Sequence, residues 1–362
     1  MGKYDKDRFL KELAVRLCLA RGMLPFLEVL VPNVSELSDS TEVLTDIDVL
    51  GLQSVQDGGL RRIAFDCKTT NKMSPINRAF WAAGILKYTR CDESFVILKS
   101  KAVHNHRISA LSINVDLHDE TSFTDLGRSF DISFAQEKKY QSSLDRWNAI
   151  YQCYTSNNWS ESLFALARNI VPLTRTPWTV FRHLVAELRS QHGYFDPLKD
   201  AHVAIFLDVL CSAFVLWTVI GRDIRRLYDP ATPKDSFETI FRYYIWGGRD
   251  SYLVRKQLRE TIAKQNDDTT SFDLPEWKQL ISFVGIIIGA PHDIFQCADV
   301  CRELSIRFGS GASAEPDKQL SLAVQSNKRV RQFVLALSDY LIVASGIPRD
   351  LNKKIEQQLL KA

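Results

Sequence analysis

Two short apolar segments that carry acidic residues constrain this chain more than any other feature. Residues 45–53 read TDIDVLGLQ and residues 61–68 read RRIAFDCK. The stretch between them contains SVQDGG, whose Asp-Gly-Gly suits a hairpin turn. We therefore expect two antiparallel neighbouring strands, with charged side chains placed on strands that otherwise have a buried composition.

The alternation of side chains along a strand predicts which of these charges meet. Asp46 and Asp48 share one face of the first strand, and Asp66 and Lys68 share one face of the second. If the strands pair through the hairpin, Asp48 lies beside Asp66 and Lys68. For Asp46, a place at an exposed strand start is favoured over a supporting role near the site.

Two carboxylates this close repel each other, and the pKa of each rises unless a cation lies between them. Hard oxygen ligands without His or Cys side chains nearby suit Mg²⁺ or Mn²⁺, which bind a couple of carboxylates, a carbonyl, waters and substrate phosphate. Lys68 could orient or help to deprotonate a metal-bound water and offset charge on phosphorus. The alternative is a surface salt bridge between the Asp residues and Lys68.

The remaining patterns predict an α/β domain over residues 1–130. The apolar periodicity predicts a helix over 5–21, and the later segments extend the order to helix, three strands, helix, strand, helix, strand. Residues 131–362 carry mainly helical patterns and are expected to form an all-α domain. Its most apolar segments, 203–221 and 280–290, are interrupted by Asp208 or too short for a bilayer, so we expect buried helices and no membrane partner.

This order of elements and acidic residues resembles the PD-(D/E)xK, or restriction-endonuclease-like, nuclease superfamily, particularly its Mrr-like and resolvase-like branches. The resemblance covers roughly residues 4–116 and implies a mixed central sheet flanked by helices. It implies that Asp48 and Asp66 bind the metal, that Lys68 is the catalytic lysine, and that Glu12 on the first helix contacts metal-bound water. Cys67 is included in the expected metal site. Ile47 replaces the Pro of the family name, and Asp66 is the less frequent alternative to Glu.

Basic residues predict where nucleic acid would be contacted. The net charge is only +3, and residues 1–130 carry equal numbers of basic and acidic side chains, so such a surface requires local clustering. Candidates after the lysine motif and in an aromatic-rich helical segment are Lys72, Arg78, Lys87, Arg249, Arg255, Lys256 and Arg259. Buried aromatic rings beneath a solvated basic face are the favoured alternative for the helical segment.

The leading hypothesis is a Mg²⁺-dependent endonuclease, with DNA favoured over RNA, acting in defence against foreign DNA or in DNA processing. Its helical domain would bind substrate, a partner protein or a second copy. The alternative is a catalytically silent nuclease-like fold that serves as a nucleic-acid-binding or protein-assembly module. Seven cysteines without framework spacing, and no signal peptide, predict a cytoplasmic protein with reduced thiols. His292, Cys297 and Cys301 lack a fourth zinc ligand, so no zinc site is expected there.

Overall fold

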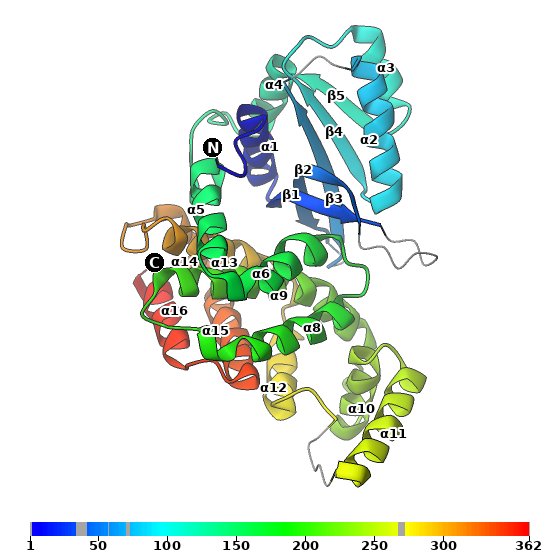
Figure 1. Ribbon diagram of the computed structural model, residues 1–362, viewed down its shortest axis with the longest axis vertical. Coiled ribbons are helices and arrows are strands. Elements are labelled where there is room, and N and C mark those ends of the chain that lie inside the picture. Colours follow the sequence, from blue (N-terminus) through cyan, green and yellow to red (C-terminus); the bar gives the residue numbers. More distant parts are fainter. Residues whose placement is uncertain (1, 34–41, 57, 70–72, 267–271, 362) are drawn as a thin grey trace.

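The computed structural model describes residues 2–33, 42–56, 58–69, 73–266 and 272–361. All of its strands lie between residues 24 and 119. From residue 140 onward, the regular secondary structure of the described chain consists of helices. Figure 1 shows the sheet and its helices at one end of the molecule and the helical part below them. The predicted α/β region followed by a helical region is confirmed at this level.

The sheet is mixed, and its spatial order follows the chain. The first three strands are antiparallel neighbours, whereas the third, fourth and fifth are parallel. The predicted hairpin is present: the Val55 N–H donates to the Gly59 carbonyl at 3.0 Å, and Gly58 adopts a φ of +79°, which favours glycine. The strands are β1 (Leu24–Pro32), β2 (Val43–Ser54), β3 (Leu60–Lys68), β4 (Glu93–Leu98) and β5 (Val115–Asp119).

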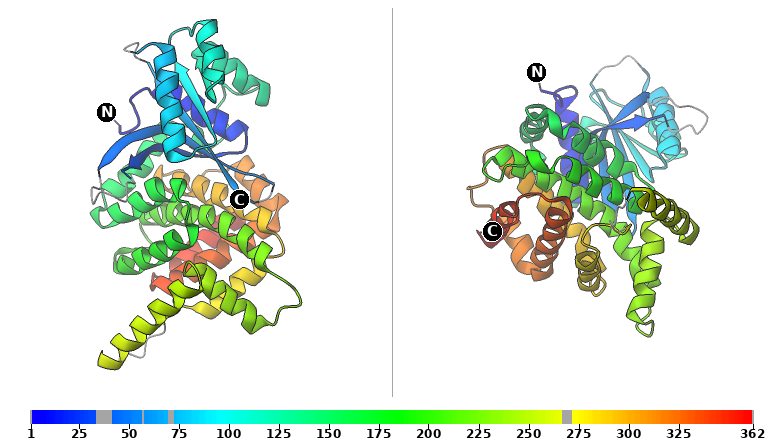
Figure 2. Two further views of the ribbon diagram at one scale, coloured as in Figure 1. Left: turned by 90° about the vertical axis from the view of Figure 1, so that its right-hand side faces the viewer. Right: turned by 60° about the horizontal axis from the view of Figure 1, so that its bottom comes forward.

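Helices cover both faces of the sheet (Figures 1 and 2). One face packs against α1 (Arg8–Ala20) and α4 (Glu120–Phe130), and the other against α2 (Pro75–Thr89) and α3 (His104–Leu111). Gly51 of β2 allows α1 to approach closely, because a Cβ there would lie 2.9 Å from the Cys18 sulfur. The sequence did not lead us to expect α4, which begins with a reciprocal cap between Asp119 and Ser122.

The helical part surrounds one long central helix, α9 (Asp200–Leu227). This helix is long and apolar enough to cross a membrane, but 94% of its most apolar window is buried inside the protein. It packs most extensively against α13, which confirms that the Val203 segment is a buried helix. The other helices of six or more residues are α5 (Leu144–Thr155), α8 (Pro177–Ser190), α10 (Lys234–Ile245), α11 (Arg249–Asn266), α12 (Trp277–Ile287), α13 (Ile294–Gly309), α14 (Lys318–Ser326), α15 (Lys328–Ser345) and α16 (Asp350–Lys361).

Between α5 and α8 the chain makes a short interrupted helix. It consists of α6 (Glu161–Ala165), a π-helical turn η3 (Leu166–Ile170) and α7 (Val171–Leu173). This segment lies against the edge strand β1, where the Leu30 N–H donates to Asn169 Oδ1 at 3.2 Å. It therefore forms part of the contact between the sheet and the helical part.

The α/β and helical parts share one core. A single cluster of buried apolar residues runs from Tyr4 to Leu359 and includes side chains from both parts. A buried ion cluster reinforces the contact: the Arg302 guanidinium lies 4.7 Å from the Phe26 ring of β1 and pairs with Asp208 of α9 at 2.6 Å. The two predicted parts are thus joined through a continuous interior.

Candidate active site

Three carboxylates occupy neighbouring positions on three adjacent strands. The pairs Leu27–Val49 and Val29–Ile47 place Glu28 of β1 opposite Asp48 of β2. Asp48 of β2 and Asp66 of β3 occupy the next facing positions beyond the pair Val49–Phe65. We call Glu28, Asp48 and Asp66 the acidic row. It lies on the face of the sheet that α2 partly covers, since Asp48 and Asp66 line a small cavity together with Trp81 of α2.

Three cations alternate with the acidic row. The Lys68 ammonium lies 2.9 Å from Asp48 Oδ2 and 3.5 Å from Asp66 Oδ1, so one cation bridges both carboxylates. Arg78 of α2 donates to both oxygens of Asp66. On the other side, the Lys11 ammonium of α1 lies 2.6 Å from Glu28 and 3.7 Å from Asp48. The predicted proximity of Asp48, Asp66 and Lys68 is therefore confirmed as geometry.

The pKa values of Asp66 and Lys68 are both raised, but for different reasons. Burial raises the pKa of Asp66, although the Arg78 guanidinium opposes this shift, and the Asp48 carboxylate adds to it. For Lys68 burial alone lowers the pKa, but the two neighbouring carboxylates outweigh it, so the pKa of the ammonium is raised. Lys68 consequently remains a cation at neutral pH.

Glu12, which the resemblance places at the metal, points elsewhere in this structure. Its carboxylate accepts a hydrogen bond from Arg8 Nε at 3.2 Å, and Arg8 in turn pairs with Asp145 of α5. The α1 residue that reaches the acidic row is its neighbour Lys11, which is only 1% exposed. Adjacent helical residues point in different directions, so one step along α1 separates the two environments.

Glu28 and Lys11 are the site residues that sequence reasoning missed. Glu28 has a φ of +47°, an uncommon backbone conformation for a residue with a side chain. The pairing register is unchanged across Glu28, from Leu27–Val49 to Val29–Ile47. A signal was present in the sequence, because Glu28 is the one charged residue in the apolar strand LPFLEVLVP.

The donor set of the acidic row suits a magnesium ion better than a transition metal. Asp48 and Asp66 are hard oxygen donors, and Mg²⁺ uses one or two carboxylates together with waters. The Cys67 N–H donates to Asp48 Oδ2 at 2.9 Å, and burial raises the pKa of the Cys67 thiol well above its ordinary value, which makes that thiol a poor metal ligand. No group of three or more His, Cys, Asp or Glu side chains is arranged to hold a metal within the described residues, so the acidic row offers at most two carboxylates to one ion as it stands. The cavity beside Asp48 and Asp66 measures only about 10 Å³, so a hydrated ion must displace Lys68 or Arg78.

The residues expected to contact nucleic acid are spread over the molecule. Lys72 lies outside the described residues, and Arg78 is held by Asp66. The remaining candidates divide between the exposed end of α2 and the outer helix α11, and they are Lys87, Arg249, Arg255, Lys256 and the half-buried Arg259.

The aromatic rings near α11 are engaged in packing. Tyr243 and Tyr252 pack edge to face with centroids 5.5 Å apart, and Trp246 stacks on Phe272 at 4.3 Å. These rings connect α10 and α11 to the segment that follows them. The interactions match the alternative of packed aromatic rings beneath a basic helix face.

Cys297 and Cys301 belong to the core of α13. Both are fully buried, and burial raises the pKa of both thiols well above the ordinary value, which disfavours the thiolate that a zinc ion needs. The Cys297 thiol donates to the main-chain carbonyls of Asp293 and Val330. These contacts use the cysteines as small buried side chains.

Comparisons of the chain with protein-family models, with curated proteins and with solved structures found no match. The geometry of the acidic row is therefore the evidence that bears on its chemistry.

Proposed function

We propose that this protein is a metal-dependent nuclease that hydrolyses phosphodiester bonds, with DNA as the favoured substrate. The observation that carries the proposal is the position of Lys68, whose ammonium lies between the carboxylates of Asp48 and Asp66 on adjacent strands. A lysine beside two carboxylates that could bind a metal suits phosphate hydrolysis, because ion and ammonium would both stabilise negative charge on phosphorus.

The element order adds support for a restriction-endonuclease-like fold. A helix, an antiparallel three-stranded meander, a crossover helix and a parallel fourth strand follow one another, with the acidic pair on β2 and β3. This is the order on which the resemblance to the PD-(D/E)xK superfamily rests. The assignment to that superfamily is part of the proposal.

Each residue of the site has a distinct task in the proposed reaction. Asp48 and Asp66 would hold Mg²⁺, which when bound polarises the phosphate and lowers the pKa of its water. Lys68, whose raised pKa keeps it protonated at neutral pH, would orient the attacking water and offset charge on phosphorus rather than accept a proton. Arg78 must release Asp66 and can then donate to a phosphate oxygen.

A second candidate is a nuclease-like fold without catalytic activity, used for binding or assembly. The observation that favours it is the near-complete neutralisation of the acidic row by Lys11, Lys68 and Arg78, around a cavity too small for a hydrated ion. In that case the charges act as a structural network.

Calorimetric titration with Mg²⁺ and Mn²⁺ separates the two candidates. The nuclease should bind the metal, Asp66→Ala should abolish binding, and Lys68→Ala should retain it. Incubation with plasmid, linear and single-stranded DNA and with RNA, with and without metal, then identifies the substrate. Lys353→Ala, at an exposed ion pair far along the chain, is the matched control. Absence of metal binding to the parent protein would contradict the proposal.

A further inference from the structure

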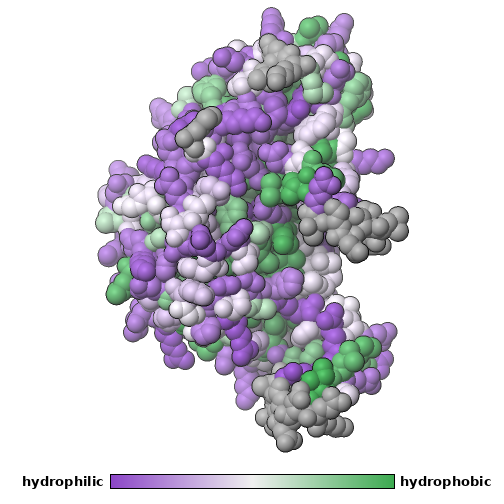
Figure 3. Space-filling model, in the orientation of Figure 1, coloured by the Kyte–Doolittle hydropathy of each residue, from purple (hydrophilic) through white to green (hydrophobic). Residues whose placement is uncertain are grey.

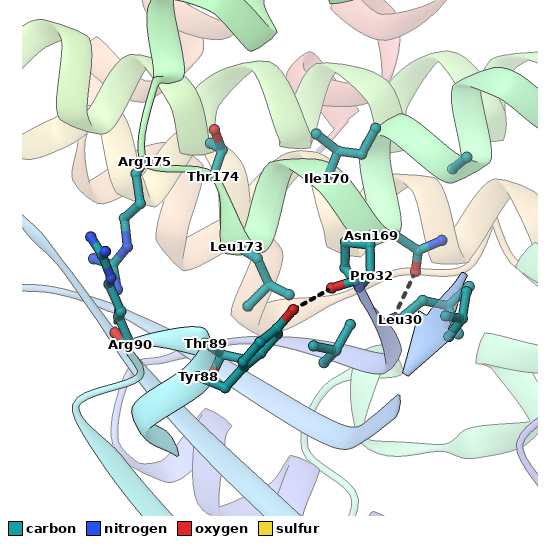
Figure 4. Close-up of a pocket in the computed structure, with 13 residues that line it drawn as sticks. Leu30, Pro32, Tyr88, Thr89, Arg90, Asn169, Ile170, Leu173, Thr174 and Arg175 are labelled. Carbon is teal, nitrogen blue, oxygen red and sulfur yellow. Dashed lines mark hydrogen bonds between the residues drawn. The ribbon is translucent and has the colours of Figure 1, made fainter. Parts of the chain in front are cut away.

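A cavity of about 510 Å³ lies between the sheet and the helical part (Figure 4). Leu30 and Pro32 of β1 and Tyr88 of α2 line one side, and Ile170 and Leu173 line the other. Ligand cavities usually measure about 300–1,000 Å³ and combine apolar walls with a few polar groups. The cavity therefore has the size and composition of a binding site for a small organic group.

Specific contacts fix the walls of this cavity. The Tyr88 hydroxyl donates to the Pro32 carbonyl at 3.3 Å, and Asn169 accepts the Leu30 N–H, as Figure 4 shows. These bonds tie the end of α2 and the turn η3 to the same edge strand. The cavity is thus held open by both parts of the molecule.

One end of the cavity is strongly cationic. Arg175 donates to the main-chain carbonyl of Arg90, and both guanidinium groups lie at the same end (Figure 4). Neither has a carboxylate partner within the part of the chain that the structure describes. Burial lowers the pKa of Arg62 to about 10, and repulsion from the nearby Arg175 guanidinium adds to this shift. Positive charge therefore gathers there, although Asp92 offsets part of the charge of Arg62.

A second, smaller cavity continues from this cationic end. It measures about 160 Å³, shares Thr174 and Arg175 with the first cavity, and is also lined by Arg62 and Arg222. Arginine guanidinium groups pair with phosphate through two parallel hydrogen bonds. The larger cavity, which we call the apolar chamber, together with this guanidinium-lined end fits a ligand with a flat organic body and a phosphate group.

The apolar chamber also lies next to the acidic row. Leu30 pairs with Asp46 across β1 and β2, and it stands two residues from Glu28 on the same strand. Two residues of a strand span roughly 6.6 Å. Asp46, the partner of Leu30, is likewise two residues from Asp48 on β2, so the wall of the chamber lies about that far along the strand from a carboxylate proposed to hold the metal.

We propose that this cavity binds one nucleotide of the substrate strand, with its base against Tyr88 and Leu173 and its phosphate on Arg90 and Arg175. The inference rests on the proposed nuclease function and adds a substrate-binding position to it. Bases stack on aromatic and apolar side chains irrespective of sequence, so the cavity selects an unpaired nucleotide rather than a particular base. An acyl chain would need one cation at most, whereas this end presents several.

The test is calorimetric binding in EDTA, which leaves the metal site out of the measurement. Thymidine 5′-monophosphate should bind, while thymidine and inorganic phosphate should each bind at least about tenfold more weakly because each fills only part of the site. A six-residue oligothymidylate should compete for the same site. Arg90→Gln/Arg175→Gln should weaken nucleotide binding by more than about tenfold. Arg128→Gln, an exposed arginine of α4, should leave it unchanged.

A second variant tests the apolar chamber. Ile170→Trp fills it from a position that is already 46% exposed, so the fold should tolerate the change, and nucleotide binding should be lost. Binding of decanoate in place of the nucleotide, or nucleotide binding with which the oligonucleotide does not compete, would overturn the inference. Nucleotide binding in EDTA without any metal-dependent cleavage would support this site while contradicting the nuclease proposal, so the two failures are distinguishable.

Discussion

The protein contains two networks in which carboxylates meet several cations, and they differ in their access to solvent. In the helical part, Asp208 accepts hydrogen bonds from Arg302, Arg168 and the Tyr154 hydroxyl at 2.6–2.8 Å, and all of these side chains are buried. In the acidic row, Lys68 keeps a fifth of its side chain exposed. The Asp208 network is sealed, whereas the acidic row opens toward a cavity.

This difference separates a structural network from a site that can exchange partners. A sealed ion pair holds its geometry because each broken contact leaves an unpaired charge in the interior. A partly exposed ammonium can leave its carboxylates when a metal ion or phosphate replaces it, since water compensates for the separation.

Asp208→Ala should lower the free energy of unfolding by about 3–5 kcal/mol, because it leaves two buried guanidinium groups without a counter-ion. Urea unfolding followed by circular dichroism measures the change. Asp350→Ala, which removes an exposed pair with Lys353, should change stability by less than about 0.5 kcal/mol. Equal effects for the two variants would refute the distinction between sealed and open networks.

Lys68→Ala should reduce metal-dependent cleavage by at least about a hundredfold, which corresponds to about 2.7 kcal/mol of activation free energy. Stability should fall by less than this in EDTA and recover on addition of Mg²⁺, because the ion can replace the ammonium between Asp48 and Asp66. Initial cleavage rates and thermal unfolding with and without Mg²⁺ provide both readouts. Cleavage by Lys68→Ala at the parental rate would show that Lys68 acts only as a salt-bridge partner.

Lys11→Met should destabilise the protein by about 2 kcal/mol, because it leaves Glu28 and Asp48 facing each other without the intervening ammonium. Lys11 contacts the acidic row but is fully buried, so its variant shows whether a buried cation at this site behaves like those of the sealed Asp208 network. The double variant Lys11→Met/Glu28→Gln should recover part of the loss, which a double-mutant cycle in urea would show. Full additivity would mean that the two residues are uncoupled.

Glu303 supplies a pH-dependent comparison within the helical part. Burial raises the pKa of its carboxyl to about 7, although the Tyr140 N–H donates to it. Since this folded-state pKa lies above the unfolded value, the folded state loses stability as pH rises from about 5 to 7, by about 1–2 kcal/mol. Glu303→Gln should flatten the stability profile over this range and leave it unchanged near pH 4. An unchanged slope would show that Glu303 does not titrate as its burial implies.

The sequence was sufficient to predict the elements that local patterns determine. The hairpin between β2 and β3 follows from Asp-Gly-Gly and the alternation around it, and the shared face of Asp66 and Lys68 follows from that pairing. The start of α2 follows from Ser74 and Pro75, where Ser74 Oγ accepts the Asn77 N–H. Each of these depends on residues close together in the chain.

The parts that could not be predicted depend on long-range contacts. Whether Glu12 or Lys11 reaches the acidic row depends on the rotation of α1 about its axis, which the packing of Cys18 against Gly51 helps to fix. The placement of Glu28 depends on an irregular backbone conformation within β1. The large cavity arises only when β1, the end of α2 and η3 come together, so no single segment contains a signal for it.

The π-helical turn η3 limits the insertions and deletions that this segment of the chain can accept. Three successive residues serve three environments: Arg168 joins the Asp208 network, Asn169 accepts a hydrogen bond from β1, and Ile170 lines the cavity. A turn with hydrogen bonds between residues i and i+5 accommodates one residue more than an α-helical turn. Losing one residue here would move all three side chains out of register at once. Related chains should therefore vary in side-chain identity at position 170 while conserving the length of this segment, so insertions and deletions should collect elsewhere.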